Sequence, residues 1–449
     1  MGFILRRNND GITMKEAETM ENQKKLLFLG GTGAMYDAVE RAKRMGIYTI
    51  VVDYYPNSPA KRIADRSYLA STTDIDRVLE IARENEIDGV FTGFSDANLM
   101  PACLVADTLG LPFYATKEQI NVTTNKLLFK ETCREYGIPV VPEFHLDGDL
   151  KREDLELIQY PVIVKPSDAW ASKGVSICEN EKELCEAVPY ALKFSQNQCV
   201  IVERYMAAYP DVCMYFNLQN GVLSLSSMCE RDMNQVQEGK AMQPNALFYP
   251  CRFIPLYYEQ LEEKLKNMTA GLGMKDGTMF MQCFVVDGML LPFEMGYRLC
   301  GAQEYILCAA ENEIDSCQMM LNYALFGACT GWNAAEKNKP MFDHSDVILL
   351  ALMKPGKITR IDGLEALRAM PEILNIIQFY YEGDEIGKGS MGTLNQTFAR
   401  IFIQGKDADR LLALIDHVQK TLKVLDENGE QMLISGYDCK KAHVLKQFD

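Results

Sequence analysis

One acid and one arginine stand close together after an apolar stretch in the second half of the chain. Two apolar runs, 279–286 and 289–294, flank an Asp-Gly pair, which is a strong hairpin signal; Glu294 ends the second run and Arg298 follows it. A carboxylate beside an apolar run is costly to bury unless it meets a cation or a metal. An arginine offers a planar and permanently charged set of donors to phosphate oxygens. The hairpin therefore predicts a metal and phosphate site.

Two lysines and a loop that precede the hairpin could supply further phosphate contacts. Lys126 follows a Thr-Thr-Asn sequence at the start of a predicted helix that Gly137 stops, and anions are favoured at helix starts. Lys165 ends an apolar strand run, 161–166, and a second strand, 175–178, follows a loop that ends in Ser-Lys-Gly. Backbone N–H groups of such a loop can surround phosphate oxygens. Either lysine alone is more usually a solvated side chain.

The first hundred residues alternate between strand and helix patterns. The expected strands are 25–29, 48–52 and 89–92, and the expected helices are 36–44, 75–84 and 97–109. Three such repeats predict a small doubly wound parallel sheet.

A glycine loop at 30–33 joins the first strand to the first helix. The dinucleotide fingerprint needs a glycine at its sixth position, but counting from Gly31 that position is Tyr36, although Asp53 stands where a ribose-binding acid would. We expect a tight strand-to-helix turn without a bound dinucleotide.

Taken in order, these motifs resemble the ATP-grasp superfamily. The order is a lysine at a helix start, a strand-Lys-Pro, a Ser-Lys-Gly loop, a strand that leads to Glu203, and a hairpin with Glu-x-x-x-Arg. The preceding β/α unit is similar to that of biotin carboxylases and carbamoyl-phosphate synthases. The resemblance covers roughly residues 25–331 and implies an α/β protein with an α+β grasp. Its expected parts are a flexible tail (1–23), a Rossmann-like domain (24–122), an ATP-grasp domain (123–330, with a mobile lid at about 130–200) and a small α+β cap (331–449).

The resemblance also implies a role for each matching residue. Lys126 and Lys165 would contact the nucleotide phosphates, and Ser172, Lys173 and Gly174 would form the lid loop over them. Glu203, Arg204, Tyr205 and Met206 would form the hinge that receives adenine, and Asp211 would meet the ribose hydroxyls. Glu294 would hold Mg²⁺, with Mn²⁺ as an alternative, and Arg298 would meet the transferring phosphoryl group or an acyl phosphate.

The sequence departs from the usual superfamily pattern at one metal ligand. Members of the superfamily usually carry another acidic metal ligand about twelve residues before the one that matches Glu294. In this sequence that position is Gln282, whose neutral carbonyl oxygen brings no charge. A strict two-residue turn at Asp287 and Gly288 would put Gln282 and Glu294 on opposite faces of the hairpin. A three-residue loop with Gly288 as a bulge would put them on one face. We therefore expect the bulged loop if Gln282 belongs to the site. The usual asparagine is replaced by Gly296, a change that relatives which ligate amino acids tolerate.

The last part of the chain resembles the cap of biotin-carboxylase-like proteins. We expect a long helix at 311–326, strands starting at 354, at 376–381 and at 399–404, and helices starting at 364 and at 407–424. The glycine-rich stretch 387–392 could line an acceptor pocket, although a plain surface loop accounts for it equally well.

Composition excludes several classes of protein. The net charge of −16 over 449 residues argues against a nucleic-acid surface, and no apolar run approaches the roughly 18 residues of a membrane span. The fourteen cysteines stand singly within apolar runs and include no C-x-x-C spacing, which favours buried thiols in a reducing cytoplasm. The four histidines lie far apart and predict no metal site.

The resemblance implies an enzyme, an ATP-dependent ligase that joins a carboxylate to an amine through an acyl phosphate. The alternative is an ATP-binding protein of the same fold with weak or absent ligase activity, for which Gln282 is the main support. A carbamoyl-phosphate synthase is disfavoured because no internal repeat appears, and a biotin carboxylase because no matching bicarbonate and biotin residues surround Arg298. The expected partners are small molecules, with a homodimer left open, and the substrates stay unassigned.

Overall fold

The computed structural model describes residues 23–144, 146, 150–167, 174–234, 242–329, 331–434 and 436–440. Its N-terminal unit contains strands β1 (Lys25–Leu29), β2 (Tyr48–Asp53), β3 (Arg66–Leu69) and β4 (Gly89–Phe91), and helices α2 (Gly33–Arg44), α3 (Ile75–Asn85) and α4 (Leu99–Leu109). The strands form one parallel sheet in the order β3-β2-β1-β4. This confirms the parallel sheet that the alternating pattern predicts.

The glycine loop after β1 is closed by the acid that follows β2. Gly30 has φ +102°, and a side chain at Gly31 would collide with the Ser58 hydroxyl. The Asp53 carboxylate accepts hydrogen bonds from the backbone N–H groups of Gly31 (2.6 Å) and Tyr55 (2.7 Å). Asp53 therefore ties two loops of the protein together. The helix begins at Gly33, three residues earlier than the sequence predicts.

A small antiparallel sheet follows two short helices. The helices are α5 (Lys117–Thr124) and α6 (Lys126–Glu135). The sheet has the strand order β5-β8-β6-β7, with bounds Glu143–Phe144, Val200–Arg204, Val162–Pro166 and Ser176–Cys178. Two further helices, α7 (Arg152–Leu155) and α8 (Glu181–Leu192), lie between these strands in the sequence. The predicted hairpin of the two strands around residue 170 is the antiparallel pair β6 and β7.

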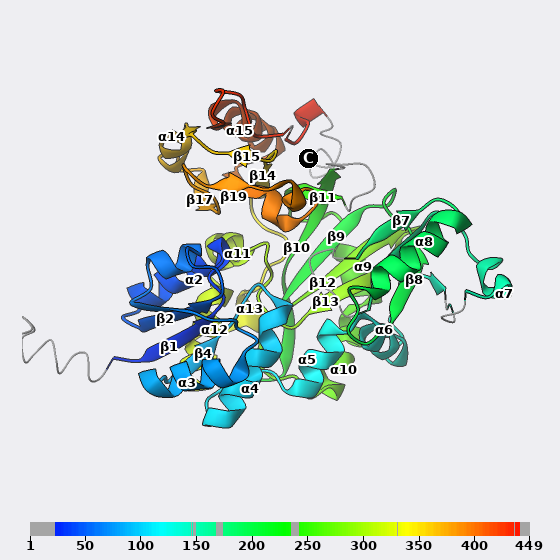
Figure 1. The fold of residues 1–449 in the computed structure, drawn as a ribbon, viewed down its shortest axis with the longest axis horizontal. Coiled ribbons are helices and arrows are strands. Elements are labelled where there is room, and N and C mark those ends of the chain that lie inside the picture. Colours follow the sequence, from blue (N-terminus) through cyan, green and yellow to red (C-terminus); the bar gives the residue numbers. More distant parts are fainter. Residues whose placement is uncertain are drawn as a thin grey trace, which may run out of the picture.

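The largest sheet has eight strands in the order β13-β12-β9-β10-β11-β14-β19-β17. Their bounds are Met289–Gly296, Gly277–Val286, Asp211–Gln219, Val222–Asn234, Gln243–Tyr249, Ser345–Leu352, Thr397–Gly405 and Ile373–Gln378. Figure 1 shows the N-terminal unit and the small sheet at opposite ends of the molecule, with the long strands between them. This sheet contains strands of both the expected ATP-grasp domain and the expected C-terminal cap domain. The boundary between the two domains at about residue 330 stays a prediction.

The helix predicted at 311–326 is wrong, because two helices occupy this region. Helix α11 spans Tyr305–Asn312 and α12 spans Ser316–Phe326. Between them Glu313 adopts a left-handed conformation (φ 59°), and the Asp315 side chain accepts a hydrogen bond from the Gln318 N–H. The acid thus starts a new helix at the point where the sequence pattern alone suggested continuation.

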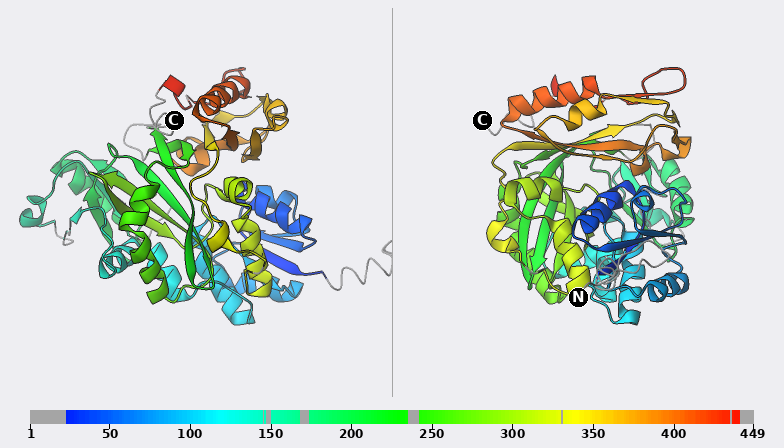
Figure 2. Two further views of the ribbon diagram at one scale, coloured as in Figure 1. Left: turned by 180° about the vertical axis from the view of Figure 1, so that it is seen from behind. Right: turned by 90° about the vertical axis from the view of Figure 1, so that its left-hand side faces the viewer.

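The remaining elements lie around the sheet. They are α9 (Ile254–Gln260), α10 (Glu262–Gly271), α13 (Ala334–Lys337), β15 (Gly356–Lys357), β16 (Arg360–Asp362), α14 (Leu364–Arg368), β18 (Glu385–Ile386), α15 (Ala408–Thr421) and β20 (Lys423–Leu425). Figure 2 shows α15 covering the side of the C-terminal strands that faces away from the N-terminal unit. None of the fourteen cysteines is in a disulfide, and most are buried, as predicted. In the described part of the chain, no helix has the length and apolar character that a membrane crossing needs.

Candidate active site

Gln282 and Glu294 face each other across neighbouring strands. The pairing register runs Val286↔Met289 at the turn but Gln282↔Glu294 further along, because the register shifts between Gln282 and Cys283. Phe293 is therefore an extra residue on β13, and its ring stacks on Phe284 with centroids 4.6 Å apart. Directly opposed residues of antiparallel strands point to one face of the sheet.

The bulged loop that we expected at Gly288 is wrong. The connection is a two-residue turn in which both Asp287 (φ 50°) and Gly288 (φ 77°) have positive φ, the requirement of a type I′ turn. The one-residue shift in strand pairing that brings Gln282 opposite Glu294 comes instead from the bulge at Phe293. Gln282 therefore stays on the face of Glu294 despite the regular turn.

A small hollow lies beside Glu294, where the N-terminal unit, α6 and the large sheet meet. It is lined by Asp96, Thr123, Thr124, Lys126, Phe129, Glu294 and Met295. Asn125 caps α6 by accepting hydrogen bonds from Leu127 and Leu128, so Lys126 is the first helical residue, as predicted. Its backbone N–H donates to the Ser167 carbonyl (3.3 Å), which joins α6 to the end of β6. Burial lowers the pKa of Lys126, and the nearby Glu294 opposes this shift.

The acid of the expected hinge lies inside a strand rather than beyond it. Glu203 belongs to β8, and its side chain is buried between two lysines: it pairs with Lys165 (2.5 Å) and with Lys130. Lys130 also pairs with Glu143 (3.2 Å). Burial would raise the pKa of Glu203, but the two lysines outweigh burial and hold that pKa below its ordinary value.

The rest of the hinge is tied into the small sheet. The Arg204 N–H donates to Pro142 (3.1 Å) and the Tyr205 N–H donates to Pro161 (2.9 Å). Met206 is buried in a small apolar cluster. These contacts fix the path of the backbone after β8.

Asp211 is engaged by an arginine on the next strand. Arg231 of β10 donates Nε and Nη2 to the two carboxylate oxygens of Asp211, each at 2.7 Å. Both side chains are almost completely buried. Because burial outweighs the arginine, the pKa of Asp211 is raised.

Arg298 is held by an acid from the N-terminal unit. Its Nε and Nη2 donate to the Asp96 carboxylate at 2.7 and 2.5 Å, and Nη1 donates to the Leu299 carbonyl at 3.0 Å. The Phe280 ring lies 4.9 Å from the guanidinium. Burial would lower the pKa of Arg298, but Asp96 more than offsets it, so the pKa is raised and the side chain stays charged.

Two of the predicted loop residues, Ser172 and Lys173, lie outside the described residues. Gly174 is described; it has φ +72°, and a Cβ there would lie 2.8 Å from Pro166. The backbone just before β7 (Ser176–Cys178) therefore favours glycine at this position.

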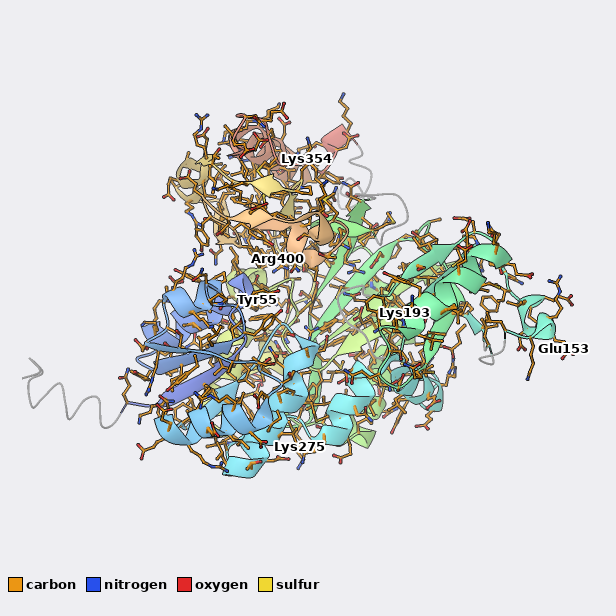
Figure 3. The ribbon with its side chains drawn as sticks, in the orientation of Figure 1. Tyr55, Glu153, Lys193, Lys275, Lys354 and Arg400 are labelled. Carbon is orange, nitrogen blue, oxygen red and sulfur yellow. The ribbon has the colours of Figure 1, made fainter. Side chains whose placement is uncertain are left out.

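A second buried arginine approaches the segment that follows Arg298. Arg400 of β19 (Figure 3) donates Nη1 to the Gln303 Oε1 (2.8 Å) and lies 4.8 Å from the Phe379 ring. Burial lowers the pKa of Arg400 to about 10. Sequence reasoning did not find Asp96, Lys130, Arg231 or Arg400 as parts of this region. Lys130 alone had a local signal, since it lies one helical turn after Lys126.

The oxygen donors of this strand pair fit a hard cation. Glu294 offers a carboxylate and Gln282 an amide oxygen on the same face, which are the oxygen ligands that Mg²⁺ prefers. Among the residues with described positions, no three His, Cys, Asp or Glu side chains group together around a metal position.

Comparisons with known proteins agree with this architecture. The family described as "D-ala D-ala ligase C-terminus" matches residues 133–233. The L-amino acid ligase from Bacillus licheniformis superposes with a TM-score of 0.71 at 19% identity, covering 90% of this chain and 99% of that one. The chain has the ATP-grasp fold. A second ATP-grasp structure, the biotin carboxylase domain of 2-oxoglutarate carboxylase from Hydrogenobacter thermophilus with Mg-ADP and bicarbonate, gives a TM-score of 0.75 at 16% identity, covering 89% and 90%.

Sequence relatives cover a smaller part of the chain. The formate-dependent phosphoribosylglycinamide formyltransferase of Sulfurisphaera tokodaii is 28% identical over 196 residues, which are 41% of this chain and 48% of that protein. The chain thus spans about half the length of the curated relatives that it matches. The resemblance to the ATP-grasp superfamily that the ordered motifs predict is confirmed.

Proposed function

We propose that this protein is an ATP- and Mg²⁺-dependent ligase that joins a carboxylate to an amine through an acyl phosphate. The observation that carries the proposal is the hollow in which the partly buried Lys126 lies beside Glu294. A cation at a helix start, with a carboxylate from a neighbouring strand beside it, suits a metal–phosphate group. The ATP-grasp fold, shared with an L-amino acid ligase, agrees with it.

In this proposal the two lysines hold the phosphates of ATP. Lys126 lies in the hollow, and Lys165 would reach it by exchanging its bond to Glu203 for a phosphate oxygen. Ser172, Lys173 and Gly174 would close over the phosphates. The backbone from Glu203 to Met206 would bind adenine. Asp211 would accept hydrogen bonds from the ribose hydroxyls through the carboxylate lone pairs that Arg231 does not occupy.

Glu294 and Gln282 would bind the metal from one face of the sheet. When bound, Mg²⁺ would neutralise negative charge on the phosphate oxygens. Because Gln282 is neutral, the site supplies one negative charge fewer than a pair of acids would, and metal affinity should be correspondingly weaker.

The remaining chemistry needs alignment rather than a side-chain nucleophile. The substrate carboxylate would attack the γ-phosphorus of ATP, and the bond to the bridging oxygen would break so that ADP leaves. The amine would then attack the carbonyl carbon of the acyl phosphate, lose a proton and displace inorganic phosphate. Arg298 would stabilise the negative charge of the acyl phosphate, and the buried surroundings would strengthen that interaction. The substrates would be small molecules of the cytoplasm.

One observation favours a second function, ATP binding with weak or absent turnover. Gln282 stands in the sequence where the resemblance leads us to expect an acid, and it lies opposite Glu294. The two functions differ in turnover and not in nucleotide binding.

A phosphate-release assay separates them. The protein is incubated with ATP, Mg²⁺ and mixed amino acids as carboxylate and amine donors, and ATP binding is followed in parallel by thermal shift. Turnover that depends on the carboxylate and disappears in Arg298→Ala supports the ligase. ATP binding without turnover on any mixture supports the second function.

A further inference from the structure

Asp96 connects the N-terminal sheet to the candidate active site. It lies five residues after the end of β4, and its side chain both lines the hollow and binds Arg298, which is 202 residues away in the sequence. None of the predicted roles uses Asp96. Asp96 therefore joins the N-terminal unit to the segment after β13, and the proposed reaction would need both.

The segment that carries Asp96 is held in place at both ends. Phe94, with φ +66°, donates its N–H to the Leu299 carbonyl (3.2 Å), the same oxygen that accepts from Arg298. Two residues after Asp96, the buried Asn98 donates to the Leu29 carbonyl at the end of β1 (2.9 Å) and accepts from Thr72 (2.7 Å). These contacts with the N-terminal unit thus fix the position of the Asp96 segment.

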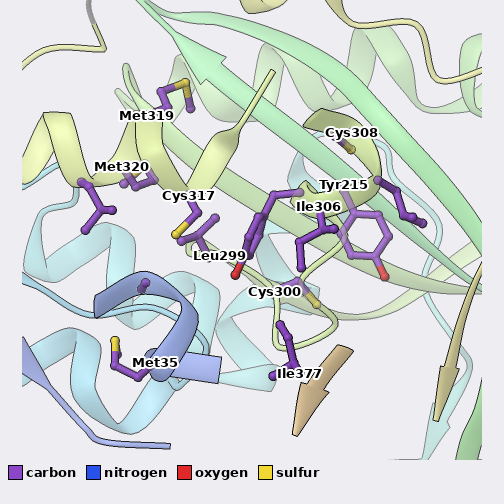
Figure 4. Close-up of a cluster of buried hydrophobic side chains, with 14 of the residues drawn as sticks. Met35, Tyr215, Leu299, Cys300, Ile306, Cys308, Cys317, Met319, Met320 and Ile377 are labelled. Atoms are coloured by element: carbon purple, nitrogen blue, oxygen red, sulfur yellow. The ribbon is translucent and has the colours of Figure 1, made fainter. Parts of the chain in front are cut away.

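The segment that carries Arg298 is anchored equally well. Leu299 and Cys300 directly follow it and belong to the main apolar core, the cluster that also contains Met35, Met319 and Met320 (Figure 4). The backbone of Arg298 therefore has little freedom, and its guanidinium is held by the Asp96 carboxylate and the Leu299 carbonyl.

The hydrogen bonds of Arg298 leave part of it for a ligand. A guanidinium has five N–H groups. Two are donated to Asp96 and one to Leu299, which leaves one on each terminal nitrogen. Two such donors suit two oxygens of one carboxylate or phosphoryl group.

We propose that Asp96 is the positioning residue of Arg298: it holds the guanidinium so that the two remaining N–H groups meet the transferring phosphoryl group or the acyl phosphate. This inference rests on the proposed ligase function. It assigns Asp96 no contact with the substrate. A misplacement of about 1 Å in such a group can cost about a hundredfold in rate.

The test compares Asp96→Asn and Asp96→Glu with the wild-type protein. We expect Asp96→Asn to lower kcat for phosphate release about a hundredfold, with the Kd for ADP changed less than threefold, and Asp96→Glu to recover part of the loss. ADP with aluminium fluoride, a mimic of the transferring phosphoryl group, should bind the wild-type protein more tightly than ADP alone. Asp96→Asn should lose this difference.

A matched control is available in another arginine–aspartate pair between units. Arg41 of α2 pairs with Asp315, the cap of α12, away from the hollow. Asp315→Asn keeps a capping side chain and should leave kcat and the aluminium fluoride effect unchanged. Unfolding of all variants in urea shows whether a loss of activity follows from a loss of folding.

One readout does not need ligase activity. The Nε–H resonance of Arg298, assigned by its disappearance in Arg298→Lys, should be protected from solvent exchange in the wild-type protein and in Asp315→Asn, and exposed in Asp96→Asn. If it stays protected in Asp96→Asn, or if that variant is as active as or more active than the wild type, the inference is overturned. Absence of ADP binding and turnover in the wild type would instead refute the proposed function.

Discussion

Gln282 of β12 lies directly opposite Glu294 of β13, and the two side chains share one face of the large sheet. An amide and a carboxylate thus stand together where the resemblance leads one to expect two acids. If both side chains bind a metal, the pair supplies two oxygen ligands but only one negative charge.

Gln282→Glu should strengthen metal binding. The substitution keeps the length of the side chain and adds the missing negative charge, and carboxylate ligands bind Mg²⁺ more strongly than amides. We expect the Mg²⁺ concentration for half-maximal phosphate release to fall by about tenfold, which is about 1.4 kcal/mol. A Mg²⁺ titration at fixed ATP measures this.

Gln318→Glu on α12 is the matched control, because it adds the same charge to a helix outside the hollow. It should leave the Mg²⁺ titration unchanged. An equal shift in both variants would show that the effect comes from net charge and that residue 282 is not a ligand.

The hairpin also shows what sequence patterns could and could not predict. The Asp-Gly turn and both strands follow from local signals, but the parity of the pairing depends on the bulge at Phe293. No residue at the bulge is a glycine, and the extra residue is accommodated by stacking on Phe284 across the hairpin. Such a contact exists only once the strands are paired.

Glu203→Gln should destabilise the protein strongly. The variant removes the acid that Lys165 and Lys130 share; Lys130 keeps Glu143, but the charge of the buried Lys165 loses its compensation, which costs about 3–5 kcal/mol. Urea unfolding at pH 7 measures the loss. Glu186→Gln, an exposed acid on α8, should change the free energy of unfolding by less than about 0.5 kcal/mol.

The same variant should change the response to acid. The pKa of Glu203 is lowered in the folded state, so its contribution is present above the ordinary carboxyl pKa of about 4.3 and is lost as pH falls through the lowered value. Between pH 5 and pH 3 the wild type should therefore lose more stability than Glu203→Gln. Parallel curves for the two proteins would contradict this explanation.

Partners from distant parts of the chain account for most of what sequence reasoning missed. Lys126, Glu294 and Arg298 have recognisable local surroundings, and the structure brings Lys126 and Glu294 to one hollow. Asp96 reaches Arg298 from a unit 202 residues away, and Asp211 is paired with Arg231 on the neighbouring strand. These pairings depend on sheet register and on how units pack, and neither is encoded in a local pattern.

Asp346→Asn should stabilise the protein above neutral pH. Asp346 is fully buried on β14, and burial, with Glu311 nearby, raises its pKa to about 8. Between about pH 4 and pH 8 the unfolded chain has released this proton while the folded chain keeps it, so stability falls as pH rises. Asparagine carries no such proton, and we expect the variant to gain on the order of 2–4 kcal/mol at pH 8 and little at pH 5.

Urea unfolding at pH 5, 6.5 and 8 measures this dependence. Asp287→Asn serves as the control, because Asp287 is exposed in the hairpin turn and asparagine is equally favoured there. A gain in Asp346→Asn that is the same at all three pH values would show that the carboxyl is already ionised when folded.

Arg298 and Arg400 are both buried, but their substitutions should have opposite effects on stability. Arg298 has the Asp96 carboxylate, whereas Arg400 bonds to the neutral amide of Gln303, and no ion pair joins it to an acid in the described part of the chain. Arg298→Met would leave Asp96 as an unpaired acid and should cost about 3–5 kcal/mol. Arg400→Met removes a charge that is costly to bury and should leave the free energy of unfolding unchanged or raise it by about 1–3 kcal/mol. Urea unfolding of the two variants at pH 7 measures the difference, and an equal loss in both would show that Arg400 has an acidic partner in solution.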